Sequence, residues 1–173
     1  MKIKKIDIKT ILYTTDLSDT ALYAFSYAAS LANAYNAKLI ILHVMEDYQA
    51  IKPSLKALLQ EEQWKAIKSD HVRETRETLS GKRRDNVIVR DILSQFSENA
   101  RAGQYGESAA SDEVIVLFGD PVEKIIATSK EKNCDIIVMG SRGRGLLQKI
   151  VGTTTSKVLK ESKIPVVAIP LEN

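Results

Sequence analysis

Five short apolar runs divide the chain. Each run is rich in isoleucine and valine and is nearly continuous, without the alternation of polar and apolar residues that marks a half-exposed strand. Strands at the centre of a parallel sheet have this pattern because they are buried on both faces. We therefore predict five strands, at residues 11–16, 38–44, 113–118, 135–140 and 165–170.

A helix is predicted between the first two strands. Ser18 or Asp19 stands at the position of an N-cap, where a serine or aspartate side chain can accept a hydrogen bond from the first amides of a helix. An apolar face at helical spacing follows, made of Leu22, Phe25, Ala29 and Ala32.

Two later segments repeat this arrangement. After the third strand, Asp120 is expected to cap a helix that begins at Pro121. Its apolar face is Val122, Ile125 and Ile126. Before the fifth strand, "TTTSKVLKESK" places Val158 and Leu159 on another apolar face. Alternating strands and helices predict an α/β fold, namely an open, mainly parallel five-stranded sheet with helices on both faces.

The connection at residues 48–112 is less regular. We predict a long exposed helix at residues 53–80, a breaker at "SGKRRDN", a second helix at residues 87–100 and a loop at residues 101–112. The second helix is favoured by apolar residues at helical spacing, which are Val89, Ile92, Leu93, Phe96 and Ala100. No internal repeat or low-complexity tract marks a second domain, so residues 1–173 are predicted to form one domain.

Composition argues against several classes of partner. The chain has 173 residues and a net charge of +3, which is too small to favour a nucleic acid or an anionic membrane. Charged residues interrupt the apolar core that a signal peptide at the start would need, and no apolar stretch approaches the roughly 20 residues that cross a bilayer. The single cysteine, Cys134, is expected to be buried. We therefore predict a cytoplasmic protein.

The residues that could bind a ligand follow the fourth strand, in "GSRGRGLLQKIVGTTTSK" at residues 140–157. Gly140 and Gly145 have the spacing of a P-loop, but Leu146 and Leu147 replace the lysine and the serine or threonine that a P-loop needs. A dinucleotide fingerprint also fails, because Gln148 occupies the position of its third glycine. Neither of the two common phosphate motifs is present.

The same stretch still suits a polyphosphate. Gly140 and Gly143 tolerate positive φ and carry no Cβ, which would let the backbone approach a ligand closely. The sequence "GTTT" then opens the last helix, and the amides of a helix N-terminus together with threonine hydroxyls favour an anion. The carboxyl ends of adjacent parallel strands line one crevice, so we expect this cradle to face Asp16 at the end of the first strand.

These residues resemble the universal stress protein family. The family's nucleotide-binding branch carries a glycine, two residues, a glycine, nine residues, and then a glycine with serine or threonine. Gly140, Gly143 and Gly152 followed by Thr153 match this pattern, with eight residues in the second gap in place of nine.

The resemblance extends to other strands. "ILYTTDLSD" resembles the family's opening strand with its adenosine-contacting aspartate, here Asp16, and has Thr14 where proline is common. "LIILHV" resembles the second strand, whose last residue, Val44, would contact adenine. "GDP" at residues 119–121 resembles the turn after the third strand, whereas residues 48–112 lack a distinctive match.

Carried onto this chain, the resemblance implies an ATP-binding regulatory protein of the stress response. Mg²⁺ would be held by the phosphate oxygens of ATP, because no pair of carboxylates stands in the loop. No catalytic residue is assigned. The implied nucleotide site consists of Thr14, Thr15, Asp16, Val44, Met139, Gly140, Ser141, Arg142, Gly143, Gly152, Thr153, Thr154 and Thr155.

Plainer roles stay open for several of these residues. Asp16 could cap the first helix, Arg142 could be a solvated charge, and Thr154 and Thr155 could simply begin a helix. His43 is predicted to be packed in the sheet, and a site with several histidines is excluded because the chain has only two.

Two other functions also stay open. The short loop and Thr14 are compatible with a nucleotide-independent adaptor that works through dimer formation. A slow ATPase is the second alternative, although no general base is visible. An adenylating enzyme of related fold is disfavoured, because no Ser-Gly-Gly motif follows the first strand.

The fifth strand predicts a homodimer. A last strand reached by a single crossover tends to lie at the edge of a sheet, and no charge protects this one from pairing. Pairing with its own copy, which the resemblance also implies, would leave no free edge. The predicted contact consists of Val166, Val167, Ala168 and Ile169. The alternative is an edge covered by residues 48–112.

Overall fold

The five predicted strands are present and form one sheet. The computed structural model describes residues 6–45, 62, 81–100, 112–141 and 151–170. All strand pairs are parallel, in the order β3-β2-β1-β4-β5. The strands end within one residue of their predicted limits: β1 is Thr10–Thr15, β2 Lys38–Met45, β3 Glu113–Phe118, β4 Ile136–Gly140 and β5 Val166–Ile169.

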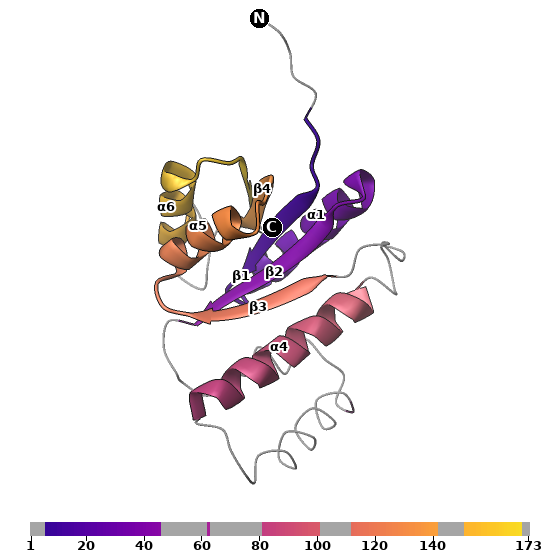
Figure 1. The fold of residues 1–173 in the computed structure, drawn as a ribbon, viewed down its shortest axis with the longest axis vertical. Coiled ribbons are helices and arrows are strands. Elements are labelled where there is room, and N and C mark those ends of the chain that lie inside the picture. The colour runs from indigo at the N-terminus through magenta and orange to yellow at the C-terminus, as the bar shows by residue number, and fades with distance from the viewer. Residues whose placement is uncertain (1–5, 46–61, 63–80, 101–111, 142–150, 171–173) are drawn as a thin grey trace, which may run out of the picture.

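Helices cover both faces of this sheet (Figure 1). Helices α1 (Asp19–Tyr35) and α4 (Gly81–Ala100) lie on one face, and α5 (Pro121–Glu131) and α6 (Thr153–Glu161) lie on the other. The predicted α/β architecture is therefore confirmed.

The core consists of two layers, because successive side chains of a strand point to opposite faces. In β1, Ile11 and Tyr13 pack against α1, whereas Leu12 packs against α5 and α6. Helix α1 approaches the sheet closely because its buried face is mostly alanine. The alanines are Ala21, Ala24, Ala28, Ala29 and Ala32. Phe25 fills the remaining space and meets the rings of Tyr13 and Phe96 edge to face.

Caps fix the starts of two helices as the sequence predicts. Ser18 is the N-cap of α1 and accepts a hydrogen bond from the amide of Ala21. Asp120 caps α5 by accepting from the amide of Glu123, and Pro121 occupies the first turn. These caps set where the chain leaves β1 and β3, and so shape the carboxyl end of the sheet.

Two local predictions are wrong. Helix α4 begins at Gly81, so most of "SGKRRDN" is helical and does not act as a breaker. Its apolar stripe of Val89, Ile92 and Leu93 is buried as expected, and this packing outweighs the low helix propensity of the glycine. In α6, Val158 is buried but Leu159 is 45% exposed, because the two residues lie about 100° apart around a helix.

The rest of the connection at residues 48–112 lies mostly outside the described residues. Residue 62 is helical, and the predicted helix at 53–80 and loop at 101–112 otherwise stay predictions. In the described part of the chain, no helix is both long and apolar enough to span a bilayer.

Candidate functional site

The site lies where the strand order changes direction. The chain moves outward from β1 to β2 and β3, then returns to the other side of β1 to form β4 and β5. In open α/β sheets a ligand binds at such a switch point, beyond the carboxyl ends of the strands. The ends of β1 and β4 are adjacent, since Thr14 pairs in register with Met139. The predicted position of the crevice, between these two strands, agrees with this topology.

Strand β1 leads into α1 through a short, heavily bonded turn. The Thr15 hydroxyl oxygen accepts a hydrogen bond from the amide of Leu17, at 3.0 Å. Asp16 Oδ1 accepts from the amide of Ser18, also at 3.0 Å. Asp16 is exposed, and its Oδ2 has no hydrogen-bond partner among the residues that the structure describes. Asp16 thus supports the start of α1 and also presents an acceptor to solvent.

Strand β4 ends beside the start of α6, and two hydrogen bonds hold them together. The amide of Gly152 donates to the Ser141 carbonyl at 2.7 Å. The Thr155 hydroxyl, which is buried, donates to the Gly140 carbonyl at 2.9 Å. The start of α6 is therefore tied directly to the end of β4.

The N-terminus of α6 is the least satisfied of the three helix starts that follow β1, β3 and β4. Ser18 and Asp120 cap α1 and α5, whereas Gly152, the N-cap of α6, provides no side chain for a hydrogen bond. The first turn of α6 also lacks an acidic residue. The backbone amides of Thr153 and Thr154 therefore carry the positive end of a helix dipole, and within the described part of the chain neither the cap nor the first turn supplies a carboxylate to balance it.

Gly140 has a packing role that the sequence did not reveal. Its φ is not positive; Gly119, at 130°, is the one glycine with positive φ in the described ranges. A Cβ built on Gly140 would lie 3.1 Å from the backbone of Thr20 and Ala21. The absence of a side chain at Gly140 thus lets the first turn of α1 pack on β4.

Apolar side chains from β2, β3 and β4 line the α5 and α6 face near this end. Val44 and Leu117 are register partners, and both pack against the cluster that contains the buried Met139. Val44 is partly exposed. Next to it, the amide of Gly119 donates to the Met45 carbonyl, which brings the turn before α5 against the end of β2. This surface could receive the flat face of a base.

Several predicted residues meet at this end of the sheet, and others lie outside the described part. The ends of β1, β2 and β4 and the start of α6 bring together Thr14, Thr15, Asp16, Val44, Met139, Gly140, Ser141, Gly152, Thr153, Thr154 and Thr155. Arg142 and Gly143 lie outside the described residues. Within the described ranges, no three His, Cys, Asp or Glu side chains form a group that could hold a metal.

Cys134 lies at the other end of β4 and is buried as predicted. Burial, helped by the carboxylates of Asp135 and Glu113, raises the pKa of its thiol to about 11. A thiol that stays protonated is a poor nucleophile, so Cys134 is a packing residue.

Sequence reasoning missed two residues behind the Asp16 turn. Leu17 has a φ of 63°, which is unusual for a residue with a Cβ. His43 is packed as predicted, but its ring also contacts the carbonyl oxygen of Thr15. A polar residue within an apolar strand was the only signal, and the bond partner depends on the pairing of β1 with β2.

Comparison with known proteins gives one family. The model of the Universal stress protein family matches residues 7–170 of the chain. Universal stress protein MJ0577 of Methanocaldococcus jannaschii is 28% identical over 166 residues, which cover 95% of this chain and 96% of that protein. Universal stress protein YxiE of Bacillus subtilis is 29% identical over 160 residues, covering 92% of this chain and 97% of its own.

Solved structures share the fold. The MJ0577 structure, at 25% identity, covers 97% of this chain and 99% of that chain with a TM-score of 0.61. A universal stress protein solved in complex with cAMP, at 22% identity, covers 95% of this chain and 98% of its own with a TM-score of 0.58. The similarity to both covers nearly the whole chain.

Proposed function

The chain belongs to the universal stress protein family, and we propose that it is an ATP-binding regulatory protein of the stress response. ATP would lie beyond the ends of β1 and β4, with its adenosine near Asp16 and Val44. Its phosphates would meet the start of α6 and the predicted loop residues Arg142 and Gly143. A relative of the same fold was solved with cAMP, which makes an adenine nucleotide the first ligand to test.

The open N-terminus of α6 carries this proposal. Its first amides lack a capping side chain and an acidic neighbour, and hydrogen bonds tie the helix start to the end of β4. A helix N-terminus with unsatisfied amides favours a phosphate. Thr153 is exposed and Thr154 partly exposed, so both can reach a ligand, whereas the buried Thr155 hydroxyl serves mainly to hold α6 on β4.

Mg²⁺ fits this arrangement only as a companion of the nucleotide. It prefers oxygen ligands and commonly binds the phosphates of a nucleotide together with water. Here the phosphate oxygens would be its main ligands, and the chain's part would be to orient the phosphates. In this proposal, bound ATP regulates the protein in the cytoplasm. None of the roles given to these residues requires the protein to hydrolyse ATP.

We propose that the protein forms a homodimer through β5. This strand lies at an edge of the sheet, next to β4 only. Val166, Val167 and Ala168 are each partly exposed and uncharged, so the described residues leave this edge accessible to a second copy. Val167→Lys would place like charges opposite each other across the two-fold axis and shift the protein toward monomer. A variant that sediments as a full dimer would contradict this pairing.

Substitution at Gly152 tests the phosphate position. Gly152 has φ −55° and ψ 151°, which an aspartate can adopt. Gly152→Asp would cap α6 and stabilise the protein by a few tenths of a kcal/mol to about 1 kcal/mol. Its carboxylate would also occupy the amides and repel phosphate, lowering ATP affinity at least about tenfold from a micromolar Kd. Gly152→Ala, which leaves the amides open, is the matched control.

Calorimetric titration with ATP and Mg²⁺ decides between this function and the alternatives. Weaker binding by a variant that is as stable as the wild type excludes damage to the fold as the cause. If Gly152→Asp binds ATP as well as the wild type does, the phosphates do not lie on α6. A wild-type protein that binds no ATP at about 1 mM, and carries no nucleotide in native mass spectrometry, would instead favour the nucleotide-independent adaptor.

A further inference from the structure

We propose that His43 is a positioning residue of the nucleotide site, whose ring holds the turn that carries Asp16. The imidazole Nδ1 lies 2.8 Å from the carbonyl oxygen of Thr15, in a buried contact. A carbonyl oxygen can only accept a hydrogen bond, so Nδ1 carries a proton and donates it. His43 and Thr15 are register partners on β2 and β1, so the bond forms where β1 ends.

The turn after Thr15 contains a strained residue. Leu17 is in the left-handed region at a φ of 63°, which residues with a Cβ adopt at a cost in free energy. Strained residues persist only where the surrounding structure holds them, and they gather at ligand sites. Two local hydrogen bonds and the burial of the Leu17 side chain against α4 and β3 hold this turn.

His43 adds a contact of a different kind. The two local bonds each join residues two apart in the sequence, so they shape the turn without fixing it to the rest of the sheet. The His43 bond joins the turn to β2, a strand inside the sheet, across 28 residues of sequence. Together with the buried Leu17, it therefore fixes the place of the turn as well as its shape.

The consequence concerns Asp16 and Val44. Asp16 directly follows the carbonyl that His43 holds, and Val44 directly follows His43 on β2. These are the two residues proposed to enclose adenosine, so the His43 bond sets the space between them. This inference rests on the proposed function for its effect on ATP, but the contact itself can be tested without any nucleotide.

Two substitutions separate the hydrogen bond from the bulk of the ring. In His43→Asn the amide nitrogen is attached to Cγ, as Nδ1 is, so a donor stays within reach of the Thr15 carbonyl. His43→Leu replaces the ring with an apolar side chain of comparable length, which fills the space but leaves that buried carbonyl without its donor. We expect His43→Leu to weaken ATP binding roughly tenfold, and His43→Asn to stay within about threefold of the wild type.

Hydrogen exchange of the free protein gives the second measurement. The amides of Leu17 and Ser18 are held by Thr15 and Asp16, so a loosened turn exposes them. In His43→Leu we expect both amides to exchange about tenfold faster, with His43→Asn close to the wild type. Asp135→Ala, which destabilises the opposite end of the sheet, serves as the stability control and should change neither this local exchange nor ATP affinity.

The outcomes are distinct. Unchanged exchange in His43→Leu overturns the inference. Faster exchange with undiminished ATP affinity also overturns it, because the turn would then not position the ligand. If the wild type fails to bind ATP, the proposed function fails, and the exchange data still show whether His43 holds the turn. Loss of affinity in both His43 variants would assign the effect to the ring and not to the hydrogen bond.

Discussion

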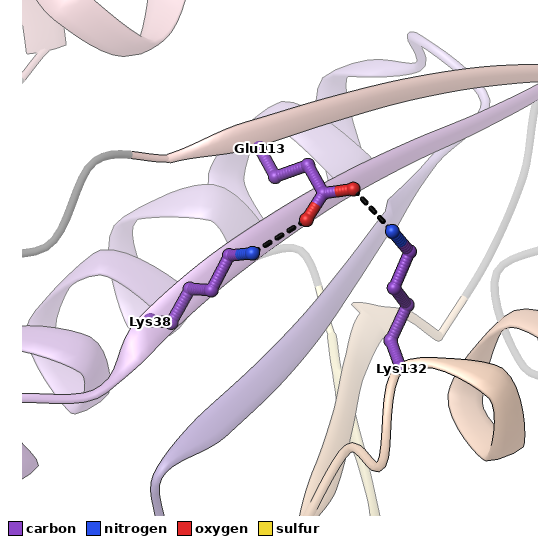
Figure 2. Close-up of polar contacts among 3 residues, drawn as sticks. All are labelled: Lys38, Glu113 and Lys132. Atoms are coloured by element: carbon purple, nitrogen blue, oxygen red, sulfur yellow. Dashed lines mark hydrogen bonds and ion pairs between the residues drawn. The ribbon is translucent and has the colours of Figure 1, made fainter.

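The two ends of the sheet carry different polar interactions. At the amino end of the strands, charged side chains bond to each other and to the backbone. Glu113 lies between Lys38 and Lys132 and pairs with both (Figure 2). The Asp135 Oδ2 accepts from the amides of Lys9 and Thr10, at 2.7 and 2.9 Å. The carboxylates of Glu113 and Asp135 at this end are therefore both paired.

The carboxyl end has a different character. It contains a left-handed residue at Leu17, a glycine with positive φ at Gly119, an exposed carboxylate at Asp16 and a helix start without a capping side chain at Gly152. Left-handed residues also occur at the amino end, at Asn36 and Asn133, but asparagine adopts this conformation more readily than leucine does. The exposed carboxylate of Asp16 and the start of α6 without a capping side chain thus distinguish the carboxyl end.

The direction of the chain explains this difference. In a sheet of parallel strands, each strand leads into a helix, so helix N-termini and their amides gather at the carboxyl end. Helix C-termini gather at the amino end, where they favour cations. Lys132, the C-cap of α5, fits that rule. The fold therefore gathers helix N-termini, which favour anions, at one end of the sheet and helix C-termini, which favour cations, at the other.

The largest expected effect comes from Gly140, where the carboxyl end depends on close packing. Gly140→Val would drive its side chain into the backbone of Thr20 and Ala21, which lies 3.1 Å from a Cβ at that position. We expect a loss of about 3 kcal/mol in the free energy of unfolding. Urea denaturation checks this, with Gly140→Ala as a graded control that should lose less. Equal stability of Gly140→Val and the wild type would mean that α1 does not need this approach.

A smaller loss is expected at the amino end, from Asp135→Ala. This change removes the acceptor of two backbone amides that start β1. We expect the free energy of unfolding to fall by about 2 kcal/mol, because charge-assisted bonds to the backbone are lost. For a chain of this size the melting temperature should fall by about 5 °C. ATP affinity should be unchanged, and an effect on binding would contradict the division between the two ends.

The sequence predicts the strands better than it predicts the contacts between them. Continuous runs of isoleucine and valine are local signals, and they located all five strands. The bonds of Asp135 to Lys9 and Thr10 span more than 120 residues, and they depend on the position of β4 next to β1. The predicted start of helix α4, at residue 87, is later than its observed start at Gly81. The local sequence indicates a helix breaker because of this glycine, but the packing of the helix on β3 offsets the low helix propensity.

The third effect concerns binding and not stability. In Asp16→Asn, one side-chain oxygen can still accept from the Ser18 amide, so the turn and the fold should be kept. The other oxygen becomes an amide group that cannot accept a hydrogen bond from ATP. We expect ATP affinity to fall about tenfold with an unchanged melting temperature. Equal affinities would reduce Asp16 to a residue of the turn.

The candidate site shows the same limit of sequence reasoning. The glycines and threonines near α6 could be found from their spacing, because a motif is a local pattern. The packing role of Gly140, the strain at Leu17 and the bond from His43 to Thr15 could not, since each depends on an element distant in the sequence. The contacts that a residue makes across the sheet depend on strand order, which local sequence patterns do not determine.

The smallest effect is expected for the ion pairs of the amino end, and it should depend on pH. Hydrogen bonds from Lys132 and Lys38 hold the pKa of the Glu113 carboxyl below its ordinary value of 4.5. A carboxyl whose pKa is lower in the folded state than in the unfolded state stabilises the fold when it is ionised. This contribution is fully present above pH 4.5 and is lost as the pH falls below that value, through the pKa of the folded state.

Glu113→Gln should therefore cost little at neutral pH and less in acid. The side chains of Glu113 and Lys38 are 30% and 43% exposed, so water and salt screen the pair, and we expect a loss of no more than about 1 kcal/mol at pH 7. Urea unfolding of both proteins at pH 7 and at a series of lower pH values would measure it, and the difference between them should shrink as the wild-type carboxyl takes up a proton. High salt at pH 7 should shrink the difference in the same way, because it screens exposed charges. A difference that grew in acid would contradict this prediction, because Glu113 would then stabilise the fold through its neutral form.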